Sequence, residues 1–150
     1  MKKNELFNSV FETELRCLLL LSAKKQLLSL DRIVSLDFIS CYSEEFQLPF
    51  ANLHGNNDYM YSEITSRRLL LRDAIKSLVT QGMVDVTVDG GYLFSISDRG
   101  RRYIKKLESE YSSEYKAIAE EAIKMYKNKS DVELELMIQN NALRSVKGGR

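Results

Sequence analysis

Hydrophobic side chains recur every three or four residues in several stretches of the chain, the period of an α-helix with one buried face. The first stretch follows the S-x-x-E sequence of residues 9–12, which is typical of a helix N-terminus. The second follows Ser29 and ends near Ser43. The third covers about residues 62–80 and ends at Gln81-Gly82, because glycine accepts the left-handed conformation that follows a helix. Its predicted buried side consists of Leu70, Leu71, Ala74, Ile75, Leu78 and Val79.

After Gly82 the helical period gives way to alternation, the pattern of a half-buried strand. Two short strands are predicted, over residues 83–88 and 92–96, on either side of the turn Asp89-Gly90-Gly91. This segment is therefore expected to form a β-hairpin.

Helical spacing returns over residues 101–129 and predicts one long helix, whose weakest point is Ser112-Ser113. Residues 130–133 repeat the S-x-x-E sequence and begin a last helix that ends at about Leu143. Between the second and third helices, residues 44–61 show no period and are rich in turn-forming residues. Their aromatic and aliphatic side chains are expected to pack on the core or to contact a partner.

This order of elements predicts a mainly α protein with a small β-hairpin, arranged as a winged helix with a long C-terminal helical extension. Residues 1–100 are expected to form the winged-helix domain. Residues 101–150 are expected to form the helical extension, which packs on that domain or on a partner. The hairpin would be the wing, and the helix before it would stand in the recognition position.

Composition narrows the class of protein. The 150 residues suit one ordinary domain, and 44% hydrophobic with 29% charged residues exclude a disordered chain. The 22 basic and 21 acidic residues leave a net charge of +1, so any attraction to nucleic acid or an anionic membrane must be local. No secretory leader follows Lys2-Lys3, and the apolar run 18–21 is far shorter than the ~20 residues that cross a bilayer. We expect a cytoplasmic protein without membrane contact.

The residues that carry enzyme chemistry are sparse. His54 is the only histidine, which excludes a site of two or more histidines. Cys17 and Cys41 lack C-x-x-C spacing and read as packing residues on helices. Gly90-Gly91 lacks the context of a phosphate-binding loop. We therefore expect no catalytic residue, no metal and no cofactor.

Basic residues on the third predicted helix form a candidate contact surface. Arg68, Arg72 and Lys76 stand four residues apart and make one cationic stripe, with Arg67 beside it. Such a stripe suits phosphates or an acidic surface on a partner, and it is equally the pattern of a solvated helix face.

The long predicted helix offers a second candidate surface. Tyrosines such as Tyr111 and Tyr115 combine apolar area with a polar tip, which suits an interface. Farther along, Ile118, Ala122 and Met125 exceed what a small winged-helix core covers, so a partner or the last helix is expected to cover them. Packing within the chain is the alternative for this face.

A series of short motifs occurs in a fixed order along the chain. They are Phe7-Asn8-Ser9, Phe11-Glu12, Leu15-Arg16, the leucines 18–21, Leu30-Asp31-Arg32, Leu36-Asp37, Leu53-His54-Gly55, Tyr61, Glu63, Arg67-Arg68 and Gly82-Met83-Val84. This series covers about residues 6–126 and resembles the middle component of bacterial ABC-three-component defence systems, the group that includes Lamassu-type antiphage modules. The chain differs from that family in its asparagine-rich histidine loop, where prolines are expected, and in the helix from Asp131 onward.

The resemblance implies a position between an SMC-like or Rad50-like ATPase and an effector, often a nuclease. It also implies a role in coupling DNA sensing to effector release. We therefore expect a non-enzymatic adaptor subunit with these two partners, any DNA contact being non-specific and within the complex. The alternative is a dimeric winged-helix transcription regulator that reads a palindromic operator, against which the near-neutral charge counts.

Overall fold

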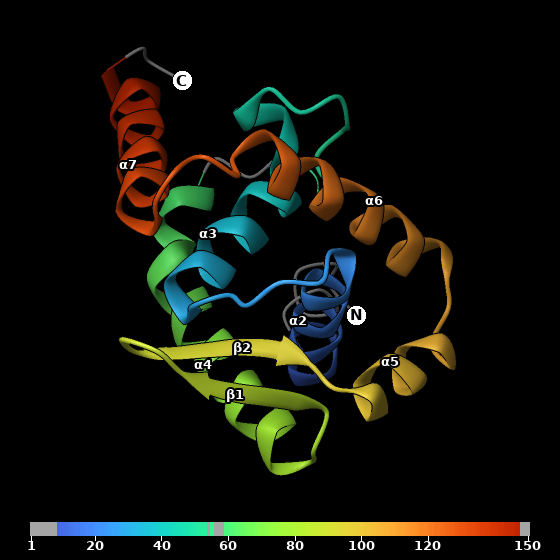
Figure 1. Cartoon of the computed structure of the whole chain (residues 1–150). Helices are drawn as coiled ribbons and strands as arrows, with labels where there is room; N and C mark the ends of the chain where they lie inside the picture. The colour runs from blue at the N-terminus through green and yellow to red at the C-terminus, as the bar shows by residue number, and fades with distance from the viewer. Residues whose placement is uncertain (1–8, 54, 56–58, 148–150) are drawn as a thin grey trace.

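The structure, a computed structural model, describes residues 9–53, 55 and 59–147. The described chain is mainly helical and contains one two-stranded antiparallel sheet, as the sequence predicts (Figure 1). In chain order the elements are α2 (Val10–Ala23), α3 (Leu30–Cys41), the 3-10 helices η1 (Ser43–Phe46) and η2 (Met60–Glu63), α4 (Ile64–Thr80), β1 (Val84–Val88), β2 (Tyr92–Ile96), α5 (Asp98–Lys105), α6 (Glu110–Met125) and α7 (Asp131–Lys147).

Helix α2 forms the centre of the molecule. The side-chain oxygen of Ser9 accepts a hydrogen bond from the Glu12 amide at 3.1 Å, which opens the helix where the sequence predicts. All of residues 15–22 are buried, because α6, α4, α3, α5 and β2 pack around α2 from different sides (Figure 1). Complete burial of a leucine side chain contributes about 1.5–3 kcal/mol, so this leucine-rich helix is the main apolar element of the core.

The segment between α3 and α4 is folded back onto the core. Phe46 and Leu48 are buried, and Ser43 donates a hydrogen bond to the carbonyl oxygen of Phe50 at 2.9 Å. The amide of Leu53 donates to the carbonyl oxygen of Cys41 at 3.1 Å. The described part of this loop therefore packs on the chain itself, which is one of the two roles expected from its sequence.

Helix α4 ends as predicted but buries a different set of side chains. Gly82 has a φ of 76°, and the Met83 amide donates to the carbonyl oxygen of Leu78 at 2.9 Å, so the left-handed glycine closes the helix. Leu70, predicted on the buried side, is 37% exposed, whereas Arg67 is 3% exposed. The buried face is rotated toward Arg67 because that side chain has charged partners inside the protein.

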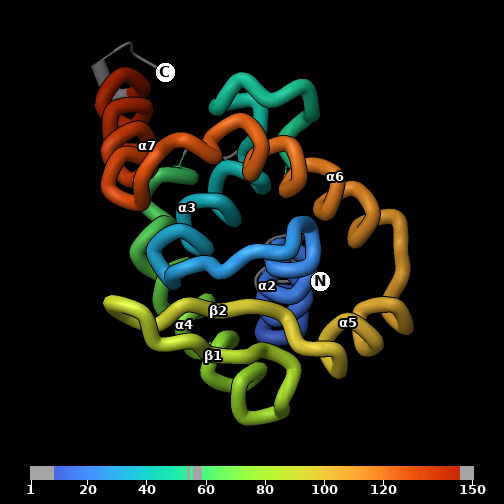
Figure 2. The backbone as a smooth tube through the Cα atoms, viewed as in Figure 1, coloured from blue at the N-terminus to red at the C-terminus, as the bar shows by residue number. Residues whose placement is uncertain are grey.

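A short bridge joins the hairpin to the helical body. Leu28, in the connection between α2 and α3, exchanges two backbone hydrogen bonds with Phe94 of β2, at 3.0 and 2.8 Å. The tube in Figure 2 shows this connection running alongside β2. The hairpin therefore has a third, very short strand on one side, while the other edge, β1, has no strand beside it in the described part of the chain.

The predicted long helix over residues 101–129 is in fact two helices. Ser109 accepts a hydrogen bond from the Ser112 amide at 3.1 Å, and the Ser109 amide donates to the Ser112 hydroxyl at 3.0 Å, so the two serines cap the start of α6. The expected weak point at Ser112-Ser113 is thus the first turn of α6, and the break lies just before it. This break lets α6 cross α2 and α3, while α7 packs beside α3 (Figure 1).

Candidate functional site

Four helices each contribute one polar side chain to a cluster in the interior. Arg16 of α2 donates from Nε to Oδ1 of Asp37 on α3 at 2.9 Å, and Nη1 of Arg67 on α4 donates to Oδ2 at 2.8 Å. Tyr115 of α6 donates from its hydroxyl to Oδ1 of Asp37 at 2.7 Å. No side chain of the four is more than 4% exposed. One carboxylate therefore joins α2, α3, α4 and α6.

The cluster contains one carboxylate and two guanidinium groups, and further groups around Arg67 compensate the extra positive charge. Burial alone would raise the pKa of Asp37, but Arg16, Arg67 and the Tyr115 hydrogen bond outweigh burial and hold that pKa well below its usual range. The Arg67 guanidinium lies 5.9 Å and 5.8 Å from the ring centres of Phe38 and Tyr42. It also lies 4.0 Å from a carboxylate oxygen of Glu63. The cluster thus stabilises the packing of the helices and does not open to solvent.

Acid should weaken the fold through Asp37. The pKa of this carboxyl is about 3.9 in an unfolded chain and lower in the folded protein, so its stabilising effect is complete above about pH 5 and is lost as the pH falls below about 4. Tyr115→Phe removes one hydrogen bond to the carboxylate, so this variant should be about 1 kcal/mol less stable at pH 7. It should also lose less stability on acidification. Urea unfolding between pH 7 and pH 3 measures both effects, and an identical acid dependence in the two proteins would contradict this assignment.

The four basic contact candidates lie in three different environments. Arg67 is inside the protein, as described above. Arg68 pairs with Asp31 of α3 at 2.5 Å and with Glu135 of α7 at 3.0 Å. Arg72 and Lys76 are exposed, Arg72 lying 3.5 Å from the neighbouring Asp73. Only the C-terminal half of the expected cationic stripe thus faces solvent without a partner on another helix.

The candidates on α6 are mostly covered by the chain itself. Tyr115 and Ile118 are buried, and Tyr111, half-buried, stacks on Tyr115 with ring centres 6.5 Å apart. Helices α2 and α3, and not α7, form the main cover of α6. Met125 remains 47% exposed. The apolar surplus expected on this helix is therefore largely absorbed internally.

A groove with a partly apolar lining lies between α4, the hairpin and the starts of α3 and α7. Its volume is about 900 Å³. Its apolar wall contains Ile75 and Val79 of α4 with Val86, Tyr92 and Phe94 of the hairpin, and Arg72 and Lys76 stand on its α4 side. Ser29, Asp31 and Asp131 line the opposite end. The exposed part of the cationic stripe thus borders an apolar groove.

The hairpin leaves apolar side chains uncovered at this groove. The cross-strand pairs Val84–Ile96, Val86–Phe94 and Val88–Tyr92 share one face of the sheet. The pair nearest the helices is buried, but Val86 is 41%, Tyr92 68% and Val88 73% exposed. An exposed apolar surface thus lies on the hairpin, whereas the sequence predicted one on residues 118–125. The signal that could have located it was the alternating set of apolar residues at positions 84, 86, 88, 92, 94 and 96.

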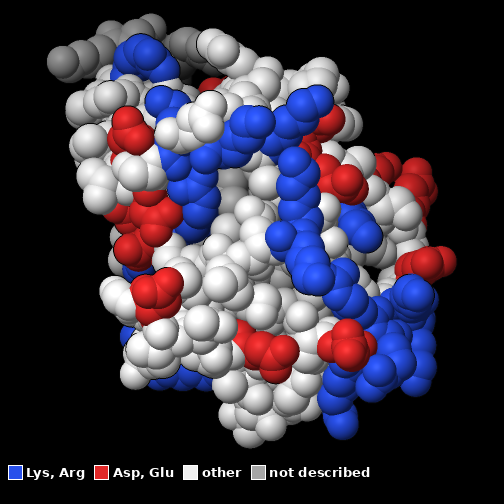
Figure 3. Space-filling model, in the orientation of Figure 1, with Lys and Arg blue, Asp and Glu red and all other residues white. Residues whose placement is uncertain are grey.

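The charge of the hairpin differs from that of α5. Residues 84–96 contain Asp85 and Asp89 but no lysine or arginine, whereas residues 98–106 contain five basic residues. Figure 3 shows the Lys and Arg side chains gathered over α5 and a mainly uncharged surface over the hairpin. The sequence predicted the basic contact surface on α4 and not on α5, because spacing along a helix cannot show which cations already have acidic partners.

Possible metal ligands and the two cysteines are the remaining candidates for enzyme chemistry. Among the described residues no group of three or more His, Cys, Asp or Glu side chains could hold a metal ion. Burial raises the pKa of the Cys41 thiol to about 11, and both cysteines are buried and unpaired with each other. His54 lies outside the described residues. Within the described ranges no helix is both long and apolar enough to cross a membrane.

Fold and surfaces together define a mainly helical protein whose distinctive exposed features are an apolar groove and a basic helix. The model of the ABC-three component (ABC-3C) system Middle Component 2 family matches residues 6–148. The chain therefore belongs to this family and is a component of an ABC-three component defence system, in which it has partner subunits. Searches of curated proteins and of solved structures found no match.

Proposed function

We propose that this middle component is a non-enzymatic adaptor that joins an SMC-like ATPase subunit to an effector, a nuclease in the simplest case. The observation that carries the proposal is the groove beside the hairpin, where Val86, Val88 and Tyr92 stay exposed in the folded chain. Uncovered apolar residues grouped on one face are typical of a protein-binding surface. A partner segment that covers them would bury apolar area, which is the main favourable term in association.

The charges around the groove favour a partner segment that is both apolar and acidic. Arg72 and Lys76 border it on the α4 side, while Asp31 and Asp131 at the far end already pair with Arg68 and Arg32. Acidic side chains on the partner would meet the two exposed cations. Complementary charge of this kind selects the partner and its orientation.

The adaptor would couple the two partner subunits by binding one of them more tightly in one of its states than in another. A groove that binds one partner more tightly in one state of the ATPase shifts that state's population, and the shift is transmitted to whatever else the adaptor holds. In a system of the Lamassu type, such a shift would link DNA sensing to release of the effector.

The element order supports a winged-helix arrangement for this adaptor, with α4 in the recognition position and the β1–β2 hairpin as the wing. In a regulator that binds an operator, these two elements would carry the phosphate and base contacts. Here the hairpin carries two aspartates and no cation, and Arg68 of α4 is held by Asp31 and Glu135. These features favour the adaptor over the dimeric transcription regulator.

Disrupting the groove should release a partner while leaving the fold intact. In the double variant Val88→Asp/Tyr92→Asp, two exposed apolar side chains become acidic, which opposes both apolar burial and an acidic partner segment. When the chain is co-expressed with the ATPase and effector of its own system, we expect affinity recovery of at least one partner to fall by more than about tenfold, or ~1.4 kcal/mol. Val88 and Tyr92 are partners across the two strands, so the two new carboxylates repel each other, and the melting temperature should fall by a few degrees while the fold is retained.

The matched control is Leu143→Asp, which changes an equally exposed residue, 56% exposed, on α7. It should leave recovery of both partners unchanged. Full assembly of the groove variant, or equal loss with the α7 variant, would overturn the proposal that the groove binds a partner.

A further inference from the structure

The basic side chains of α5 differ from the arginines of α2, α3 and α4 in having no acidic partner in the described part of the chain. Each arginine of α2, α3 and α4 forms an ion pair with an aspartate or glutamate. In the described part of the chain, no ion pair involves the five basic residues in or directly after α5. These five, called the α5 patch here, are Arg99, Arg101, Arg102, Lys105 and Lys106.

The α5 patch concentrates positive charge in a nearly neutral chain. Residues 98–106 contain five basic residues and one acidic residue, a net charge of +4, whereas the whole chain has a net charge of +1. Figure 3 shows Lys and Arg side chains gathered over α5, at the lower right of the face in view. A field of this kind attracts anions locally even though the chain as a whole does not.

The patch weakens the helix that carries it. Arg99, Arg102 and Lys106 are spaced by three and four residues, so like charges are neighbours on one face and repel each other. The helix dipole disfavours Arg99 and Arg101 in the first turn, although it favours Arg102 and Lys105 in the last turn. A charge pattern that opposes local stability is typical of a functional surface.

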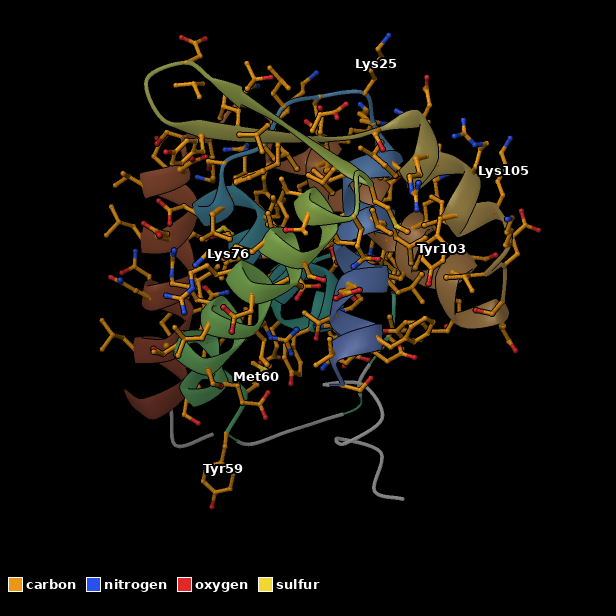
Figure 4. All side chains as sticks on the ribbon, turned by 90° about the horizontal axis from the view of Figure 1, so that it is seen from below. Lys25, Tyr59, Met60, Lys76, Tyr103 and Lys105 are labelled. Atoms are coloured by element: carbon orange, nitrogen blue, oxygen red, sulfur yellow. The ribbon has the colours of Figure 1, made fainter. Side chains whose placement is uncertain are left out.

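The fold holds α5 in one position and directs its charges outward. Ser97 accepts a hydrogen bond from the Gly100 amide at 3.1 Å and donates to the carbonyl oxygen of Gly82 at 2.7 Å, which fixes the start of the helix. Tyr103 and Ile104 pack against the core. Figure 4 shows Lys105 projecting away from the body of the molecule and Tyr103 on the inner side of the same helix. The cations are therefore arranged before any ligand binds.

We propose that the α5 patch binds the phosphate backbone of duplex DNA without sequence preference. Its exposed residues are charged, with no exposed large apolar side chain among them, whereas a protein interface has an apolar centre. It also offers no exposed aromatic ring on which an unpaired base could stack. The patch can therefore attract a ligand only through its positive charge, and positive charge is sufficient for binding to a phosphate backbone.

The dimensions of the helix match those of the proposed ligand. The eight residues of α5 span about 12 Å at ~1.5 Å per residue. One strand of duplex DNA places a phosphate about every 3.4 Å along the helix axis, so roughly three to four phosphates face that length. Five cations are enough to neutralise them. This surface is separate from the groove, so the two proposals stand or fall independently.

Binding of the full-length chain to a fluorescent 30-base-pair duplex of arbitrary sequence tests the inference, with anisotropy recorded at several salt concentrations. If the patch neutralises the three to four phosphates that face it, the logarithm of the binding constant should fall with the logarithm of the salt concentration with a slope of about −3. The variant Arg99→Glu/Arg102→Glu/Lys106→Glu should bind more than about tenfold more weakly, and its slope should be smaller in magnitude by about 3.

A second triple variant, Lys124→Glu/Lys127→Glu/Lys129→Glu, changes the net charge equally at the far end of α6. It should bind DNA within a few-fold of the unchanged chain. Equal loss in both variants would overturn the inference, because binding would then follow net charge and not the α5 patch. So would tighter binding to a single strand of the same length, or patch-dependent binding to phosphatidylserine vesicles as tight as that to the duplex. The α5 variant should still recover the ATPase and the effector as well as the unchanged chain does, which would separate loss of DNA binding from loss of partner binding at the groove.

Discussion

Asp37→Asn is expected to unfold the protein under conditions in which the unchanged chain is folded. The substitution preserves side-chain volume but removes the carboxylate that Arg16 and Arg67 share, leaving two buried guanidinium groups without their main counter-charge. Breaking a buried pair in this way costs about 3–5 kcal/mol, a large share of the ~5–15 kcal/mol that stabilises a typical domain. Urea unfolding followed by circular dichroism measures the loss.

The control for this variant is Asp31→Asn, which also removes an aspartate from an arginine. The Asp31 side chain is 51% exposed, so the loss of its pair with Arg68 should cost less than about 1 kcal/mol. Arg16→Met/Asp37→Leu/Arg67→Met removes all three buried charges together and should recover part of the stability. Equal costs for Asp37→Asn and Asp31→Asn would show that the buried cluster contributes no more than a surface pair.

Gly100→Ala is expected to destabilise the protein even though alanine normally favours a helix. A Cβ at position 100 would lie 2.8 Å from Cγ1 of Ile96 and still closer to the carbonyl oxygen of Met83. Backbone of the hairpin base cannot move aside cheaply, so the substitution should cost about 2–3 kcal/mol. The melting temperature should fall by roughly 5–10 °C, as calorimetry would show.

Gly90→Ala separates this clash from the general effect of losing a glycine. Gly90 has a φ of 67° and open space around its Cα, so alanine there meets only the cost of the left-handed backbone, about 1–2 kcal/mol. In a helix interior, alanine is otherwise favoured over glycine by about 0.5–1 kcal/mol. A Gly100→Ala protein as stable as the original would therefore show that α5 does not pack against Met83 as described.

The elements that follow local rules were predictable from sequence. Ser9 and Ser29 accept hydrogen bonds from the amides three residues later, as the predicted helix starts require. The Ser130–Glu133 cap is confirmed by reciprocal hydrogen bonds of 3.1 and 2.7 Å. The hairpin and the glycine that ends α4 also occur where expected. Caps and turns depend on neighbouring residues, so a short stretch of sequence contains the information.

The buried face of α4 and the break before α6 could not be predicted from the sequence, because they depend on residues far apart in the chain. Arg67 is buried because Asp37, thirty residues away, and the rings of Phe38 and Tyr42 accommodate its charge. A helical-period argument places any arginine on the solvent side, so Leu70 was expected inside and Arg67 outside. The break before Ser109 was displaced for a similar reason, since α6 must turn to cross α2 and α3.

The sequence could predict what types of surface the protein exposes, but not where they lie. The sequence indicated surplus apolar area and a local cationic patch, and both are present. Both lie in other places than the sequence predicted. Helices α2 and α3 cover Ile118, whereas part of the hairpin face stays exposed. Ion pairs hold Arg68 but not Arg99. Which apolar face and which cations remain free is a property of the assembled tertiary structure.

The two hydrogen bonds between Leu28 and Phe94 have a mechanical consequence. Because they attach β2 to the link between α2 and α3, the hairpin cannot pivot alone: it must either break both bonds or carry that link with it. A displacement of the hairpin at Tyr92 would therefore reach the N-terminal end of α3, whose first turn contains Asp31 and Arg32, and Arg32 pairs with Asp131 at the start of α7. The Leu28–Phe94 pair therefore couples the position of the hairpin to that of the start of α3.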